Sequence, residues 1–428
     1  MDFLFDYAGF LAIALLFLFM ILGVPVFVSM AMSALFASLV IDDFDLVVRN
    51  FVQITWQSAS IFELVALPLF ILTGTIMQHS DAGRDLFTVT KAWVGSVSNS
   101  LGVATIVACG IFAAISGSSI ATAATVGLVA IPLLLEESYG RQRATGFVAG
   151  GGTLGIIIPP SIPLILYGVV TETSIGQLFI AGVVPGIIML TFFGLYVYLS
   201  RPAIQVDRSV SWEERWRVTR QSLGVILLPI AIITAIYTGV FTPTEVGALA
   251  VVYVVVLGLI QRRLSFEKMQ KAVSLATKTT GMLFMLIVFG QYFAHFLTFE
   301  QIPQAIADVI VANAGGVMAV TLMIFAYLVL GMFLESAAML LISIPIFYPV
   351  ATQAGMDPIT FGIFACIAME IAQISPPVGV NLFTIHGITR IPLWTIAKGA
   401  LPFLLLQLVM LYLVYYLPQL TLWLPKSM

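Results

Sequence analysis

The chain has 428 residues, of which 60% are hydrophobic and only 9% are charged. A soluble domain carries about 25% charged residues, so this composition could not cover a folded water-soluble surface. It excludes a cytosolic enzyme, a disordered chain and a secreted disulfide scaffold, and the net charge of -3 gives no reason to expect nucleic acid as a partner. The sequence predicts an integral protein of the lipid bilayer.

Apolar stretches long enough to cross the hydrocarbon core recur along the chain, since a spanning helix needs about 20 residues. Ordinary spans are predicted at 8–23, 25–41, 62–79, 177–200, 222–241, 245–260, 280–299 and 400–423. Two amphipathic segments, 43–61 and 264–279, predict helices that lie along the membrane surface. The polar residues 206–221 predict a cytoplasmic linker.

Two apolar stretches are too long for one span. Residues 101–135 are interrupted at Ser116–Ser119, and residues 316–350 are interrupted around Gly331–Ala338. Each stretch therefore predicts either a single long crossing or a re-entrant hairpin with its tip inside the membrane.

Two further stretches carry a proline pair at membrane depth. Residues 144–170 contain Pro159-Pro160, and residues 360–388 contain Pro376-Pro377. Proline lacks the backbone N–H and clashes with the preceding turn, so both stretches predict broken spans.

The basic residues decide between a crossing and a hairpin for 101–135. With a hairpin, all Lys and Arg except Arg49 and Lys426 fall on one face, which is 16 of the 18. The positive-inside rule makes that face cytoplasmic. This interpretation places both termini in the periplasm.

A shift of 217 residues superimposes Pro159-Pro160 on Pro376-Pro377. We expect a first repeat over 1–205 and a second over 222–428, inserted upside down because five full crossings per half is an odd number. The predicted fold is an all-α polytopic membrane protein of about ten full spans, two of them broken, with two re-entrant hairpins and two surface helices. The expected order in the first repeat is scaffold spans 8–41, surface helix 43–61, span 62–79, hairpin 101–135, broken span 144–170 and span 177–200. In the second it is scaffold spans 222–260, surface helix 264–279, span 280–299, hairpin 316–350, broken span 360–388 and span 400–423.

The breaks are the candidate site. Non-helical backbone at membrane depth is tolerated where it lines a cavity, and its free carbonyls and neighbouring hydroxyls suit a small cation such as Na⁺. The alternative is that small residues only allow close helix packing. Glu335 and Glu370 lie in the same region, either as cation or proton sites or as locally hydrogen-bonded structural carboxyls. Ser118 or Ser119 could also be the nucleophile of an intramembrane serine enzyme, although no His lies at a matching depth.

Three motifs resemble the large membrane subunit of TRAP transporters, and the resemblance covers essentially the whole chain. The longest runs from Gly151 to Pro163 as GGTLGIIIPPSIP and is followed by Tyr167-Gly168. The other two are SGSSIAT from Ser116 and SPPVGVN from Ser375.

The resemblance implies an elevator-type importer of the bacterial inner membrane, driven by sodium ions and carrying an organic acid such as a C4-dicarboxylate or a sialic acid. It implies an extracytoplasmic substrate-binding protein and a separate small four-helix membrane subunit as partners. One Na⁺ region would comprise Ser116, Gly117, Ser118, Gly152 and Thr153. A second would comprise Gly331, Glu335, Ser375, Pro376 and Gly379. The substrate would contact Ser119, Thr122, Ser161, Ser336 and Asn381.

Two other transport mechanisms stay open at this point. A stand-alone Na⁺/dicarboxylate carrier would need no binding protein, and a channel would pass substrate in both directions without cation coupling.

Overall fold

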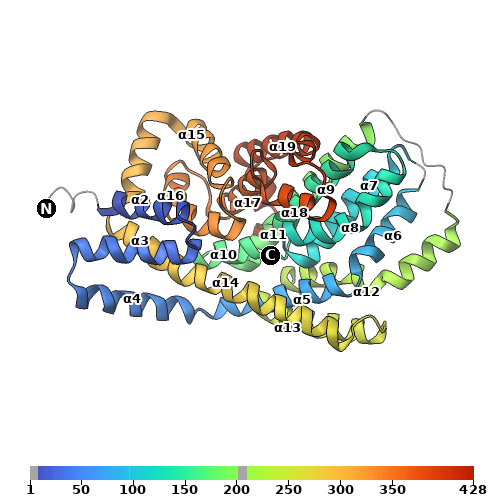
Figure 1. The fold of residues 1–428 in the computed structure, drawn as a ribbon, viewed down its shortest axis with the longest axis horizontal. Coiled ribbons are helices and arrows are strands. Elements are labelled where there is room, and N and C mark those ends of the chain that lie inside the picture. The colour runs from blue at the N-terminus through green and yellow to red at the C-terminus, as the bar shows by residue number, and fades with distance from the viewer. Residues whose placement is uncertain (1–7, 96, 201–209) are drawn as a thin grey trace.

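The computed structural model describes residues 8–95, 97–200 and 210–428, and every regular element within them is helical. Nine of the described helices are long and apolar enough to cross a membrane. The chain is thus an all-helical polytopic membrane protein (Figure 1).

The first half of the chain contains the elements up to residue 199. They are α2 (Ala8–Ile21), α3 (Val26–Ile41), α4 (Phe44–Ala59), η1 (Phe62–Val65), α5 (Ala66–His79), α6 (Ala82–Val94), α7 (Ser100–Ser116), α8 (Ser119–Glu136), α9 (Gly140–Ile157), α10 (Ile162–Val170) and α11 (Ile175–Leu199).

The second half begins at residue 212. Its elements are α12 (Trp212–Tyr237), α13 (Pro243–Ile260), α14 (Phe266–Phe299), α15 (Ile302–Leu330), α16 (Ser336–Gln353), α17 (Pro358–Ile374), α18 (Val380–Thr389), α19 (Leu393–Tyr416), α20 (Gln419–Leu422) and η2 (Pro425–Ser427).

Polar caps set where many of these helices begin. A serine or threonine hydroxyl accepts a backbone N–H that would otherwise lack a partner in the first turn. At α13 the cap is reciprocal, because Thr242 and Glu245 each accept a backbone N–H from the other. Single caps of this kind start other helices at Ser118, Ser161, Ser174, Ser211 and Ser265.

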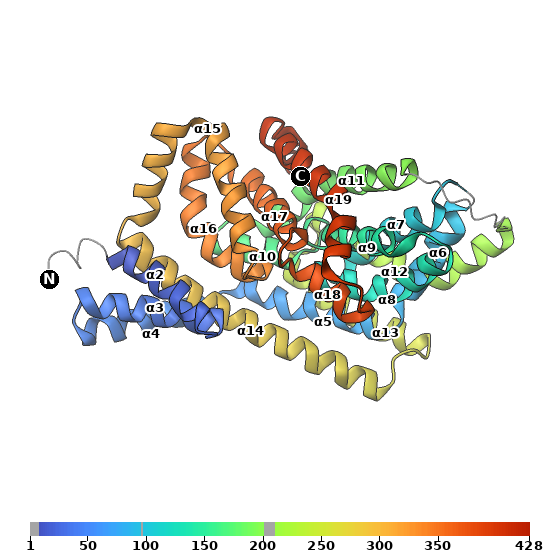
Figure 2. The ribbon, with the colours of Figure 1, turned by 45° about the horizontal axis from the view of Figure 1, so that its top comes forward.

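Two groups of helices are visible in the ribbon. Helix α14 runs diagonally beneath the molecule and packs against α3, α4 and α5, while α13 packs against α5 (Figures 1 and 2). Above them, α9 packs against α7, α8 and α19, and α15 packs against α16 and α17.

The structure differs from the sequence prediction around 264–299. We expected a surface helix over 264–279 followed by a span over 280–299, whereas α14 is one continuous helix capped by Ser265. The physical reason is that no proline interrupts it, and its two glycines, Gly281 and Gly290, each cost only about 1 kcal/mol in a helix. The predicted amphipathic helix over 43–61 is present as the separate helix α4.

Part of the predicted linker over 206–221 is helical. Its residues 206–209 lie outside the described part of the chain, and 212–221 form the first turns of α12, which Ser211 caps. The last predicted span, 400–423, instead ends as helix α19 at Tyr416, because Pro418 cannot continue it. The first helix of the predicted 316–350 hairpin starts earlier, at Ile302.

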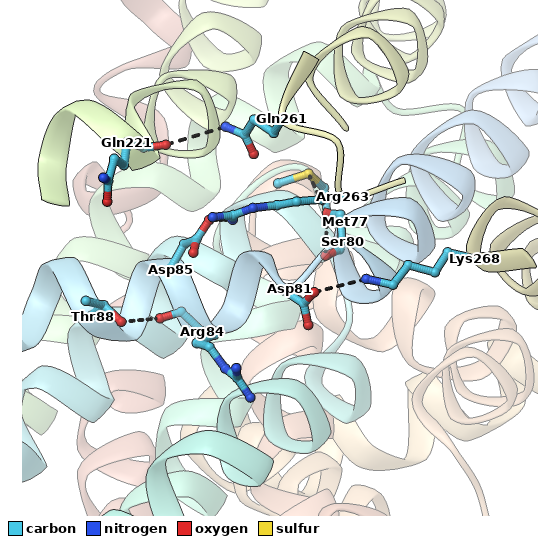
Figure 3. Close-up of polar contacts among 10 residues, drawn as sticks. All are labelled: Met77, Ser80, Asp81, Arg84, Asp85, Thr88, Gln221, Gln261, Arg263 and Lys268. Carbon is cyan, nitrogen blue, oxygen red and sulfur yellow. Dashed lines mark hydrogen bonds and ion pairs between the residues drawn. The ribbon is translucent and has the colours of Figure 1, made fainter. Parts of the chain in front are cut away.

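The amphipathic helix α6 was not predicted, because its 13 residues are too short for a span and carry Arg84, Asp85 and Lys91. Two ion pairs fasten α6 and its N-cap residue to the turn between α13 and α14 and to the first turn of α14 (Figure 3). Lys268 Nζ lies 3.0 Å from Asp81 Oδ2, and Arg263 pairs with the less exposed Asp85. Burial raises the pKa of Asp85, while Arg263 opposes the shift.

Candidate functional site

The first hairpin tip is the turn between α7 and α8. Helix α7 ends at Ser116, and Gly117 adopts the left-handed conformation, with φ 61°, that glycine favours. The Thr122 hydroxyl donates to the Ser118 carbonyl at 2.8 Å and lies 3.1 Å from Ser116 Oγ. The predicted residues Ser116, Ser118 and Thr122 are therefore brought together in one compact turn.

This tip lies directly against the break between α9 and α10. The backbone N–H of Ile162 donates to the Gly117 carbonyl at 3.3 Å. A Cβ on Gly117 would stand 2.6 Å from the Pro160 carbonyl oxygen, and one on Gly155 would stand 2.6 Å from the Ser118 carbonyl oxygen. Two glycines thus permit backbone-to-backbone contact between the tip and the break.

The hydroxyls of the first broken span have definite partners. Ser161 Oγ accepts the N–H of Leu164 and caps α10. Thr153 Oγ1 donates to the Gly150 carbonyl at 2.6 Å and accepts from Gln407 Nε2 at 2.6 Å. Gly152 faces Ala123, whose Cβ would lie 2.8 Å from a Cβ placed on the glycine. The Thr153 hydroxyl therefore bonds to its own helix and α19, not to the tip.

The second tip is the turn between α15 and α16. Glu335 is the N-cap residue of α16, yet its side chain makes no capping bond. Its Oε1 is buried without a hydrogen-bond partner among the described residues. Ser336 is the first residue of the helix, and a Cβ on Gly331 would lie 2.3 Å from Ala372 Cβ. This tip, too, touches a broken span, because Ala372 belongs to α17.

The second break runs from Ser375 to Gly379, between α17 and α18. It includes Pro376, and Ser375 Oγ donates to the Ala372 carbonyl at 3.0 Å. Gly379 has φ 52°, and a Cβ there would lie 2.7 Å from the Gln373 carbonyl oxygen. Asn381 is fully buried, and neither of its amide atoms has a hydrogen-bond partner in the described part of the chain.

Two glutamines that the sequence analysis missed connect the halves. Ser119 Oγ donates to Gln373 Oε1 at 2.9 Å, and Gln407 Nε2 donates to Thr153. Both glutamines are fully buried, and each leaves one amide atom without a partner among the described residues: Nε2 of Gln373 and Oε1 of Gln407. Their only signal in the sequence is an uncharged polar side chain inside an apolar helix.

Glu370 is the most deeply enclosed carboxyl among the described residues. It is fully buried in α17, and neither carboxylate oxygen has a hydrogen-bond partner among those residues. The structure thus gives no local hydrogen bonds to support the interpretation of Glu370 as a locally hydrogen-bonded structural carboxyl. No three His, Cys, Asp or Glu side chains in the described ranges come together as a metal-binding group.

The helices define a polytopic membrane protein in which each of the two tips contacts a broken helix. A solved structure supports the fold: the YdaH transporter of Alcanivorax borkumensis matches with a TM-score of 0.62 and covers 90% of each chain. Because only 15% of the residues are identical, this likeness concerns the fold alone.

Sequence comparison defines the family. Residues 13–420 match the family described as "Tripartite ATP-independent periplasmic transporter, DctM component". The C4-dicarboxylate TRAP transporter large permease protein DctM of Pseudomonas aeruginosa is 39% identical over 383 residues, covering 89% of this chain and 90% of that protein. The sialic acid TRAP transporter large permease protein SiaM of Vibrio cholerae is 33% identical over 370 residues, covering 85% and 86%.

The chain therefore belongs to the DctM family and is the large permease subunit of a TRAP transporter. It is a multi-pass protein of a bacterial inner membrane and not an enzyme, which rules out the intramembrane serine enzyme. The names of its relatives differ in substrate, and a tripartite system implies both a small membrane subunit and a periplasmic binding protein.

Proposed function

We propose that this permease imports an organic acid, of the C4-dicarboxylate or sialic acid type, by Na⁺-coupled elevator transport. The observation that carries the proposal is the double contact between tip and break. Gly117 contacts the Pro160 region in one half, and Gly331 contacts Ala372 in the other. Interrupted helices that meet in this way supply backbone carbonyls for a cation and helix N-termini for an anion.

In this proposal the two halves of the chain, 1–205 and 222–428, have opposite orientations in the membrane. The helix pairs α7–α8 and α15–α16 are re-entrant hairpins, the first opening to the cytoplasm and the second to the periplasm. Both termini are periplasmic, as the distribution of basic residues favours.

The moving unit comprises the two hairpins and the broken spans α9–α10 and α17–α18. The hydrogen bond between Ser119 and Gln373 supports treating them as one body, because it joins a tip of the first half to a broken span of the second. The frame comprises the spans of 8–41 and 222–260 with α4 and the 266–279 part of α14. Helices α3 and α4 both pack against α14, which runs along the lower side of the view in Figure 2.

Sodium ions bound at the two tips couple Na⁺ entry to substrate transport. One Na⁺ region is proposed at Ser116–Ser118 with Gly152 and Thr153 of α9, and the other at Gly331 and Glu335 with Ser375, Pro376 and Gly379. Closing of both tips by Na⁺ would complete the substrate site between Ser119, Thr122, Ser161, Ser336 and Asn381. Cation and anion affinities should then be linked reciprocally.

The partners follow from the tripartite family. We assign substrate delivery to the extracytoplasmic binding protein and extension of the frame to a small four-helix membrane subunit.

The test is uptake of radiolabelled succinate and sialic acid into liposomes that contain the chain and the small subunit. An inward Na⁺ gradient and the binding protein are each supplied or omitted. We expect uptake of one of the acids only when both are present. Uptake without the binding protein would favour the stand-alone carrier, and uptake indifferent to Na⁺ would refute the coupling.

A further inference from the structure

A pocket outside the tips lies between the C-terminal part of α8 and the end of α18. These helices pack together, and the pocket has a volume of about 510 Å³. Its apolar wall includes Leu128, Ile131 and Pro132, and its polar lining includes Arg141 and Arg390. Such a space is large enough for a small organic acid.

The two arginines are available to a ligand. Both are exposed, and neither side chain forms an ion pair or hydrogen bond with another residue in the described ranges. The contrast is with Arg263 and Lys268, which pair with aspartates of the α6 region. No acidic side chain of the described chain lines the pocket.

A pocket of about 400 Å³ lies at the related helices α10 and α16, and residues of α14 and α15 complete its lining. Leu128 and Pro132 in the first pocket correspond, at the 217-residue shift, to Pro345 and Pro349 in the second. At the same shift Glu172 falls on Thr389, one residue before Arg390. Glu172 and Arg390 both have the left-handed backbone, with φ 54° and 60°. The two pockets thus share one related pair of helices, and the equivalent helix ends carry opposite charges.

We propose that the pocket with Arg141 and Arg390 is an anion site, which receives the carboxylate of the transported acid on the cytoplasmic side before release. Guanidinium groups bind carboxylates through paired N–H donors, which suits this class of ligand. At the periplasmic mouth, Glu172 favours the approach of a cation instead. The assignment of sides and of the acid rests on the proposed function, whereas the pocket and its charges do not.

An introduced thiol can report on the pocket without any transport. Leu128 lines the pocket and is 62% exposed, whereas the two native cysteines, Cys109 and Cys366, are fully buried. In Leu128→Cys the new thiol is therefore the reactive one. At low salt, two nearby guanidiniums should make an anionic methanethiosulfonate react faster than a cationic one by about tenfold after correction for their intrinsic rates.

The decisive variant adds Arg141→Gln and Arg390→Gln to Leu128→Cys, and the control adds Lys398→Gln, a cation stacked on Trp394 outside the pocket. Leu128 also lines a neighbouring pocket with Arg84 and Lys91, so we expect the preference for the anionic reagent to fall severalfold in the first variant without vanishing. In the second variant the preference should be unchanged. Restoring the charges with Arg141→Lys and Arg390→Lys should restore it. An unchanged preference in the double Gln variant would overturn the proposal.

Protection of the introduced thiol by a bound acid then tests whether the pocket binds the transported acid. Succinate or sialic acid at millimolar concentration should slow labelling of Leu128→Cys severalfold, and chloride at equal ionic strength should not. In liposomes, the double Gln variant should weaken half-saturation from the cytoplasmic side severalfold while periplasmic half-saturation is unchanged. No protection by either acid would overturn the site. Protection together with uptake that ignores Na⁺ would refute the proposed coupling and leave the site standing.

Discussion

Replacing Gly117 by alanine tests the contact between the first tip and its break. The residue has φ 61°, where a Cβ costs roughly 1–2 kcal/mol. The new Cβ would also stand 2.6 Å from the Pro160 carbonyl oxygen, and relieving such overpacking typically costs about 1–3 kcal/mol. The tip in Gly117→Ala should therefore be destabilised by about 2–5 kcal/mol in its closed position.

Gly140 supplies the matched control. Its φ is 77°, but a Cβ there would meet nothing within 4 Å, so Gly140→Ala carries only the backbone cost. The closed tip should therefore be destabilised by about 1–3 kcal/mol more in Gly117→Ala than in Gly140→Ala. This difference lowers the ratio of closed to open tips by roughly 5- to 150-fold.

The assay is Na⁺-driven uptake into liposomes, with the thermal midpoint of the purified protein as a check on folding. We expect Gly117→Ala to be inserted and folded yet almost inactive, and Gly140→Ala to keep most of its uptake. Equal uptake by the two variants would show that the tip does not need its close approach to the break.

Three further outcomes are expected. Burial raises the folded-state pKa of Asp85 above 3.8, so its protonated carboxyl stabilises the folded protein at low pH, and this contribution is lost as pH rises through the folded pKa. The thermal midpoint should therefore fall as pH rises over that range, and Asp85→Asn should make the fall smaller. In a double-mutant cycle, Ser119→Ala and Gln373→Ala should couple by about 0.5–3 kcal/mol, and additive effects on unfolding would argue against the bond joining the halves. Gly146→Ala places a Cβ 2.3 Å from a backbone oxygen of α19 and should lower the thermal midpoint by several degrees. Gly194→Ala, which has open space around it, should leave the midpoint unchanged. A similar midpoint for both variants would contradict this packing.

The sequence contained enough information to predict the broken helices. The proline pairs Pro159-Pro160 and Pro376-Pro377 forbid continuous helix, and they fall between α9 and α10 and between α17 and α18. Local chemistry of this kind acts within one turn, so it can be recognised without knowing the fold.

Contacts between distant segments could not be predicted in the same way. Ser119 and Gln373 are 254 residues apart, as are Thr153 and Gln407, and no local pattern specifies either pair. Helix α6 was missed because its charges have no evident purpose until Arg263 and Lys268 are seen beside it (Figure 3). Amphipathicity suggested a separate helix over 264–279, but it does not mark a helix end, and without a proline 266–279 continues into the following span.

In the proposed mechanism, Na⁺ and the organic acid cross the membrane together. Its most direct test is the entry of radioactive sodium into liposomes that contain the permease and its small subunit, with the binding protein outside. Adding the transported acid should accelerate sodium entry, and Gly117→Ala should abolish this acceleration. Substrate that enters while sodium entry stays unchanged would contradict the account.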